Sequence, residues 1–414
     1  MNFAILQTGY YSNDMNSSSH MQRALQWTLT VLGFLFASVL AIALFYMIRP
    51  VDFESLGVLG LYAFLIPSQL LMICALAALV AAICLRQVWR KQWRWPGIAF
   101  ASIALIALPM SLWPMLSLYA MARQHDVQLS LVDSLIPSIT LGGIQQDKSV
   151  RYATVDGQDL MLDVWPVSAT TNATTRTPRP AIIRLHGGGW IAGTRSEFPE
   201  WNTWLNELGF VVFDVEYRLA PPVRWLDEVG DVKCALGWVA SHAAQYRIDS
   251  NRISIMGNSA GGHLAMLAAY TMGDPIVSSS CDAVRVKINA VVNIYGPSDL
   301  PLGYHQSGSL HYVQHAMDAF IGGSPEAYAD RYRILSPITY VNRKTPPTIT
   351  LLGTNDRIVT TEQAQRLDRA LTAAGVAHEM VLLPASDHGF DANWNGLSAQ
   401  IARAKVKAFL RRYD

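Results

Sequence analysis

Three residues of this sequence have the types and the order along the chain that nucleophilic hydrolysis requires: Ser259, Asp356 and His388. A serine hydroxyl is a weak nucleophile until a neighbouring base removes its proton, and the base needs an acid that orients it. We predict that His388 is this base and that Asp356 holds its imidazole in the correct tautomer and stabilises its charge. Asp387 is a rival acid, but because it adjoins the histidine we expect it to point elsewhere.

The surroundings of Ser259 favour a nucleophile. The stretch "ISIMGNSAGGHLA" places this serine between Gly257 and Gly261, where an apolar strand gives way to a helical pattern. A sharp strand-to-helix turn of this kind exposes a serine hydroxyl above a sheet, and small residues flank it because nothing larger fits. The alternative is an ordinary tight turn in which Ser259 only caps the helix.

A run of three glycines, Gly187 to Gly189, follows the apolar strand in "RPAIIRLHGGGWIAG". Attack on an ester carbonyl places negative charge on its oxygen, and backbone N–H groups can bind that oxygen only where side chains leave room. We therefore predict an oxyanion hole made by donors of this glycine loop and by the N–H of Ala260, the residue after the nucleophile.

The elements that must position these residues alternate between strands and helices. An expected hairpin at 149–167 precedes strands at 181–187, 210–217, 252–257, 288–296, 348–353 and 378–384, with helices between most of them. This alternation predicts an α/β fold with a mostly parallel, doubly wound sheet. Asp356 and His388 each follow a strand, at the edge of the sheet where ligands bind. Residues 299–344 interrupt the alternation and could supply a lid or a wall of the site.

Five motifs follow one another within residues 149–414: "HGGGW", "YRLAP", "YRIDSNRISIMGNSAGGHLA", "SPITYVNRKTPPTITLLGTNDRIV" and "HGF". In this order they resemble the α/β-hydrolase esterases of the hormone-sensitive-lipase and bifunctional feruloyl/acetyl-esterase type. One departure is the sequence around the acid, "NDRIV", where hormone-sensitive-lipase-like proteins usually carry Asp-Pro-Leu.

The resemblance implies roles for further residues. It assigns the oxyanion donors to Gly188 and Gly189 together with Ala260, and it gives His186 the structural role of bracing the glycine loop. It also gives Tyr217 and Arg218 a structural role behind the active site. Gly187, Gly257 and Gly261 complete the structural support of the site.

The N-terminal part has a different composition. No charged residue lies between Arg23 and Arg49, between Glu54 and Arg86, or between Arg94 and Arg123. Since about 20 apolar residues span a bilayer, these gaps predict three transmembrane helices, at about 25–48, 56–85 and 97–121. We expect a disordered tail at 1–23, a membrane region at 24–122, a linker at 123–148 and the catalytic domain at 149–414. A cleaved signal peptide is the alternative for the first span, but no small-residue cleavage site follows it.

The loop charges predict the orientation of these helices. Arg86, Arg90, Lys91 and Arg94 lie between the second and third spans, and positive loops face the cytoplasm. We therefore expect an integral membrane protein with a cytoplasmic N-terminus and an extracytoplasmic catalytic domain. Cys234 and Cys281 would then lie where disulfides form, but sequence alone leaves their pairing open.

Other function classes have little support. The net charge is +1 without a long basic run, so we expect no nucleic-acid partner. His311 and His315 have helical spacing, but no acidic or cysteine partner accompanies them, and we predict neither a metal nor a cofactor. We expect a membrane-anchored hydrolase of small or medium acyl esters, with lipid esters as one possibility. An amidase, arylformamidase or peptidase with the same triad, and a catalytically inactive interaction module, are the alternatives; the oligomeric state stays open.

Overall fold

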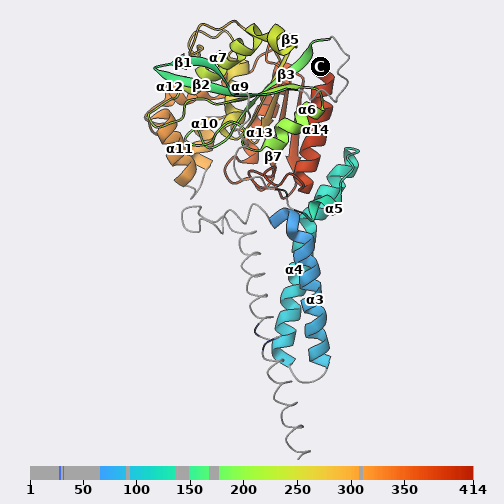
Figure 1. Cartoon of the computed structure of the whole chain (residues 1–414). Coiled ribbons are helices and arrows are strands. Elements are labelled where there is room, and N and C mark those ends of the chain that lie inside the picture. Colours follow the sequence, from blue (N-terminus) through green and yellow to red (C-terminus); the bar gives the residue numbers. More distant parts are fainter. Residues whose placement is uncertain are drawn as a thin grey trace, which may run out of the picture. The chain divides into compact units, whose positions relative to one another are not determined.

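The computed structural model describes residues 66–89, 94–136, 138, 149–166, 177–306 and 311–413, together with Thr28 and Val31. The chain divides into two compact units. The smaller unit contains most of α3 (Ile66–Trp89) and the first part of α4 (Arg94–Gln124), and the larger unit contains everything from Pro114 onward (Figure 1).

The larger unit is built on an eight-stranded sheet with the order β1-β2-β4-β3-β5-β6-β7-β8. β1 and β2 pair antiparallel, β2 pairs antiparallel with β4, and all remaining neighbours are parallel. The predicted mostly parallel sheet is therefore confirmed. The strands are β1 (Ser149–Val155), β2 (Gln158–Trp165), β3 (Arg179–Leu185), β4 (Val211–Val215), β5 (Ile248–Asn258), β6 (Ile288–Ile294), β7 (Thr348–Gly353) and β8 (His378–Leu383).

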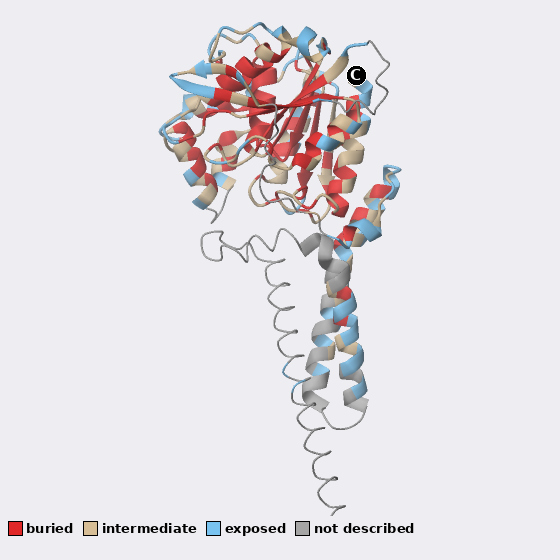
Figure 2. Ribbon diagram, viewed as in Figure 1, coloured by how far each residue is buried: buried red, intermediate tan, exposed pale blue. Residues whose placement is uncertain are grey.

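Helices cover both faces of this sheet. α7 and α9 pack on one face, where Val232 and Leu264 join a core cluster with β3 and β5, while α6 and α14 pack on the other through Trp201 and Ile401. The parallel strands are buried on both faces, which explains their continuous apolar runs (Figure 2). The helices are α5 (Leu131–Ser134), α6 (Pro199–Glu207), α7 (Asp227–Ser241), α8 (Ala243–Tyr246), α9 (Ala260–Tyr270), α10 (Leu300–Gln306), α11 (His311–Ile321), α12 (Ala329–Leu335), the 3-10 helix η1 (Pro337–Tyr340), α13 (Thr361–Ala374) and α14 (Leu397–Tyr413).

The predicted membrane region is only partly described. Within the described ranges, no helix is both long enough and apolar enough to cross a bilayer, so the predicted spans are not supported at residues 66–85 and 97–121. Residues 56–65 of the second predicted span lie outside the described residues. The last turns of α4 instead contribute Leu118 and Ala122 to a core cluster of the larger unit. Apart from Thr28 and Val31, the span predicted at 25–48 lies outside the described residues.

The described part of the segment expected to be a linker, residues 123–136 and 138, is hydrogen-bonded to the C-terminal part of the larger unit. Ser130 N–H donates to Gln400 Oε1 at 2.8 Å, and Ser138 O accepts from Trp394 N–H at 3.0 Å. The larger unit therefore includes residues before the boundary predicted at residue 149, among them the chain from Pro114 onward.

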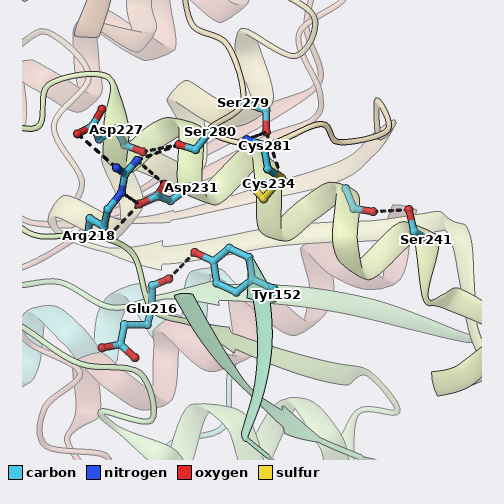
Figure 3. The surroundings of a disulfide bond; sticks show 11 residues. Tyr152, Glu216, Arg218, Asp227, Asp231, Cys234, Ser241, Ser279, Ser280 and Cys281 are labelled. Carbon is cyan, nitrogen blue, oxygen red and sulfur yellow. Dashed lines mark hydrogen bonds and ion pairs between the residues drawn. A yellow bond between two sulfur atoms is a disulfide. The ribbon is translucent and has the colours of Figure 1, made fainter. Parts of the chain in front are cut away.

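A disulfide joins Cys234 of α7 to Cys281 of the loop between α9 and β6 (Figure 3). The sequence left this pairing open, and the structure places the two Cα atoms 5.5 Å apart. Arg218 makes a second connection between this loop and α7. It forms a bidentate ion pair with Asp231 of α7 and also donates to Ser280 Oγ of the loop at 3.1 Å.

Candidate active site

Ser259 lies at the sharp turn between β5 and α9, and its backbone is strained. Its φ is 54° and its ψ is −121°, a conformation that non-glycine residues rarely adopt. The turn needs the flanking glycines, since a Cβ on Gly257 would lie 2.2 Å from Gly261 O and one on Gly261 would lie 2.3 Å from His186 O. Backbone therefore packs on backbone, and the serine side chain is left at the wall of a cavity.

The parallel strands bring the three predicted residues to one edge of the sheet. Asp356 follows β7 and His388 follows β8, and β7 pairs with β8 up to the end of both strands. His388 Nε2 lies 2.9 Å from Ser259 Oγ, and His388 Nδ1 lies 2.8 Å from Asp356 Oδ2. Asp356 is itself fixed, because its Oδ1 accepts the N–H groups of Ile358 and Val359 at 2.9 and 2.8 Å. The structure thus joins all three side chains in one hydrogen-bonded chain.

The surroundings of His388 favour its protonated form. Burial acts to lower its pKa, but the negative charges of Asp356, Asp387 and Asp391 outweigh burial and raise the pKa above the ordinary 6.5. Asp387, the rival acid, accepts the N–H of His388 itself and lies 3.7 Å from Arg357. It does not bond the imidazole, so the geometry favours Asp356 as the orienting acid.

The glycine loop lines the same cavity as Ser259. Gly188 and Gly189 have φ values of +106° and +60°, which side chains disfavour. A Cβ on Gly188 would lie 2.0 Å from Ala192 O, and one on Gly189 would lie 2.7 Å from the Tyr312 hydroxyl oxygen. Ala260 is the first residue of α9, where backbone N–H groups have no helical acceptor. The backbone at the predicted oxyanion donors is therefore bare and borders the nucleophile.

His186 lies behind the glycine loop and has no contact with Ser259 among the described interactions. Its ring stacks on Tyr217 with centroids 4.3 Å apart, and its Nδ1 donates to Gly187 O at 2.8 Å. The Tyr217 hydroxyl donates to His186 O at 2.8 Å. Burial lowers the pKa of His186 to about 4, so the imidazole is neutral at pH 7. These contacts suit the bracing role that the resemblance implied.

A cavity of about 300 Å³ opens above Ser259. Its apolar wall comes from α11, which presents Val313, Ala316 and Met317, and from Ile358 and Val359 after the acid. The segment 299–344 therefore supplies a wall, as expected from the sequence. The remaining lining residues are Gly187, Gly188, Gly189, Trp190, Glu197, Phe198, Asn258, Ser259, Tyr295, Pro297, Gly303, Tyr312, His388 and Gly389.

A buried carboxylate near this site was missed at the sequence level. Asp391, three residues after His388, is 2% exposed and bonds Asn258, Tyr295 and Trp201. The sequence marks two of its partners, because Asn258 precedes the nucleophile and Tyr295 follows β6 at the edge of the sheet where the site lies. It does not mark Asp391 itself, because no periodicity or motif connects this aspartate with them.

Known proteins resemble this chain over the same region. The family model BD-FAE matches residues 169–371, just under half of the chain. The chain is 30% identical over 260 residues to Esterase LipQ and 31% identical over 235 residues to the probable carboxylic ester hydrolase LipM, both from Mycobacterium tuberculosis. These matches cover 61% and 56% of this chain and 59% and 54% of the relatives, so the chain spans little more than half of their length.

The fold also resembles solved esterases. Thermogutta terrifontis esterase 2 phosphorylated by paraoxon superposes with a TM-score of 0.53 at 25% identity, over 64% of this chain and 93% of that one. The larger unit therefore has the α/β-hydrolase fold, and the matches support a carboxylic-ester hydrolase. Within the described residues, no cluster of His, Cys, Asp and Glu side chains could hold a metal ion.

Proposed function

We propose that this protein is a serine hydrolase that cleaves carboxylic esters through an acyl-enzyme on Ser259. The observation that carries the proposal is the continuous chain from Ser259 Oγ to His388 Nε2, at 2.9 Å, and from His388 Nδ1 to Asp356 Oδ2, at 2.8 Å. This chain ends at a strained serine beside bare backbone, which is the arrangement that acyl transfer requires.

The proposed reaction has two halves. Ser259 Oγ attacks the ester carbonyl while His388 Nε2 takes the hydroxyl proton, and the N–H groups of Gly188, Gly189 and Ala260 bind the oxygen that becomes negative. His388 then returns the proton to the alcohol oxygen as the ester bond breaks. In the second half, His388 activates a water molecule, which attacks the acyl-enzyme and releases the acid and free Ser259.

Asp356 would determine the direction of proton transfer. Because its Oδ2 accepts Nδ1–H of His388, the lone pair of Nε2 faces the Ser259 hydroxyl. Its negative charge also stabilises the imidazolium that forms during attack. Two backbone N–H groups hold this carboxylate in place.

We propose small or medium acyl esters as substrates. The cavity has a volume of about 300 Å³ and a wall of apolar side chains from α11, with Ile358 and Val359. Such a wall favours an apolar acyl group of limited length. Glu197 and Tyr312 also line the cavity and could hydrogen-bond the alcohol part of the substrate.

The proposal is tested with p-nitrophenyl esters of two to sixteen acyl carbons and with matching p-nitroanilides. Wild type should hydrolyse the esters, with kcat/KM highest at short or medium chains, and Ser259→Ala should lose at least about 10⁴-fold in rate. Faster cleavage of anilides than of esters would point to an amidase. Absence of turnover with every substrate, in protein that is folded by circular dichroism, would favour an inactive interaction module.

We also propose that the catalytic unit works outside the cytoplasm and that the N-terminal part attaches the chain to a bilayer. The charge-free stretch between Arg23 and Arg49 is long enough to span a bilayer and supports the attachment. The Cys234–Cys281 disulfide supports a location outside the cytoplasm, since such bonds persist in oxidising compartments. Extraction at alkaline pH and protease accessibility in intact cells test the proposal; release into the alkaline supernatant would contradict attachment.

A further inference from the structure

The strongest unexplained feature of the molecule is the buried carboxylate of Asp391. A buried charge is costly unless donors satisfy it, and three side chains do so here. Trp201 Nε1–H of α6 donates to Oδ2 at 2.8 Å, Asn258 Nδ2–H at the end of β5 donates to the same oxygen at 2.6 Å, and the Tyr295 hydroxyl donates to Oδ1. All four residues are at most 3% exposed.

These donors come from the segments that position the reacting groups. Asn258 immediately precedes Ser259, so its side chain fixes the turn that presents the nucleophile. The Tyr295 ring packs on the His388 ring with centroids 4.4 Å apart. The Phe390 ring contacts the Tyr295 ring edge-to-face, with centroids 5.3 Å apart. Asp391 itself belongs to the loop that carries His388. One carboxylate therefore ties the histidine loop to the nucleophile turn.

The Tyr295 hydroxyl remains protonated and can act as a donor. Burial raises the pKa of this phenol well above its ordinary value, and the charge of Asp391 raises it further. The hydroxyl also accepts a hydrogen bond from Asn258 Nδ2 at 3.1 Å. Trp201, Asn258 and Tyr295 thus each donate one proton to the Asp391 carboxylate, and Asn258 donates a second proton to the Tyr295 oxygen.

We propose that Asp391 is a positioning residue of the hydrolase: its carboxylate holds His388 against Ser259 and its charge favours the imidazolium that forms during attack. The inference rests on the proposed function and adds to the predicted triad a second carboxylate, which does not touch the imidazole. Its effect on His388 passes through the Tyr295 ring, through the shared loop and through the electric field.

Several charged groups surround His388, and Asp391 is one of them. Asp356 bonds the ring from the loop after β7, and Asp387 lies beside it in its own loop, where Arg357 is 3.7 Å away. Arg403 of α14 interacts electrostatically with Asp391. Burial lowers the pKa of Arg403 to about 10, so its guanidinium is charged at pH 7. The charge of Asp391 contributes to the raised pKa of His388. Removing that charge should therefore lower the pKa.

The experiment compares Asp391→Asn with wild type in kcat, KM and the pH dependence of kcat/KM on a p-nitrophenyl ester. We expect kcat to fall by about 10²-fold at nearly unchanged KM, because a small displacement of the base slows proton transfer. We expect the acidic limb of kcat/KM to shift to lower pH, because His388 then stays neutral further into the acid range. A purely structural role would not move this limb.

Asp163→Asn is the matched control. Asp163 is equally buried and also has three side-chain donors, Ser149, Arg195 and Ser196, but it lies on β2 and neither borders the cavity nor acts on His388. We expect this variant to unfold at a lower temperature and to keep the acidic limb of wild type. Tyr295→Phe removes one donor but retains the Asp391 charge. Its kcat should therefore fall, while the acidic limb of its kcat/KM profile should stay at the pH of wild type.

The outcomes separate the two proposals. If wild type hydrolyses esters but Asp391→Asn keeps both its kcat and its acidic limb, the role of Asp391 is refuted. If wild type itself has no activity that depends on Ser259, the proposed function fails instead. Should Asp391→Asn not fold, Tyr295→Phe and Trp201→Phe each still remove one donor, and wild-type kcat in both would overturn the positioning role.

Discussion

Removal of the Cys234–Cys281 disulfide should destabilise the catalytic unit by a predictable amount. The bond connects residues 47 positions apart, and it joins α7 to the loop between the nucleophile helix α9 and β6 (Figure 3). Breaking it frees this loop in the unfolded chain. The perturbation is Cys234→Ala together with Cys281→Ala, since a serine in the fully buried position of Cys234 would need a hydrogen-bond partner.

The size of the effect follows from the loop length. In the chain-entropy relation, a closed loop of 47 residues reduces the entropy of the unfolded chain by an amount worth about 4 kcal/mol at 25 °C. Single domains have unfolding free energies of only about 5–15 kcal/mol, so this is a large share. For a domain of this size, each kcal/mol corresponds to roughly 2–4 °C in unfolding temperature, which gives a decrease of about 8–16 °C.

Thermal unfolding followed by circular dichroism measures this decrease in wild type and in the double variant, each with and without a thiol reductant. Reductant should lower the unfolding temperature of wild type toward that of the double variant and leave the double variant unchanged. Cys74→Ala removes a cysteine outside the disulfide and should leave the transition of the catalytic unit in place. Equal unfolding temperatures in oxidised wild type and the double variant would refute the loop-entropy reasoning.

Three further predictions concern the site. Asp356→Asn should lower kcat by about 10⁴-fold, measured on a p-nitrophenyl ester, because His388 loses the acceptor that orients it. In wild type, kcat/KM should fall as the pH decreases, with a midpoint above 6.5, since the base must be neutral and its pKa is raised; a midpoint below 6.5 contradicts this. Gly189→Ala should lower kcat by about 10²–10³-fold, because its Cβ would meet the Tyr312 hydroxyl and displace an oxyanion donor; Tyr312→Phe in the same chain should restore part of the loss.

The sequence predicted most of the catalytic unit because local signals and the global fold agree there. Buried parallel strands require apolar runs, and tight turns at their ends require glycine, so both strand positions and the neighbourhood of Ser259 were readable. The order of Ser259, Asp356 and His388 along parallel strands was sufficient to place them at one edge of the sheet. The pairing of β7 with β8 then brings Asp356 close to His388.

Other features depend on contacts that leave no periodic signal. The Asp391 network joins residues up to 190 positions apart, and nothing in the composition of its loop marks that carboxylate. The pairing of Cys234 with Cys281 needed the distance between α7 and a loop, which sequence does not supply. In the N-terminal part, a charge-free run predicts apolar surroundings but does not distinguish lipid from the protein core that Leu118 and Ala122 join.

The most direct test of the central claim is the identity of the residue that becomes covalently modified. The protein is incubated with paraoxon, release of p-nitrophenol is followed, and the modified peptide is identified by mass spectrometry in wild type and in Ser259→Ala. One phosphoryl group on Ser259, formed in parallel with loss of ester hydrolysis and absent from Ser259→Ala, is the expected result. Ester hydrolysis that continues in Ser259→Ala, or inactivation with the phosphoryl group on another residue, would contradict the account.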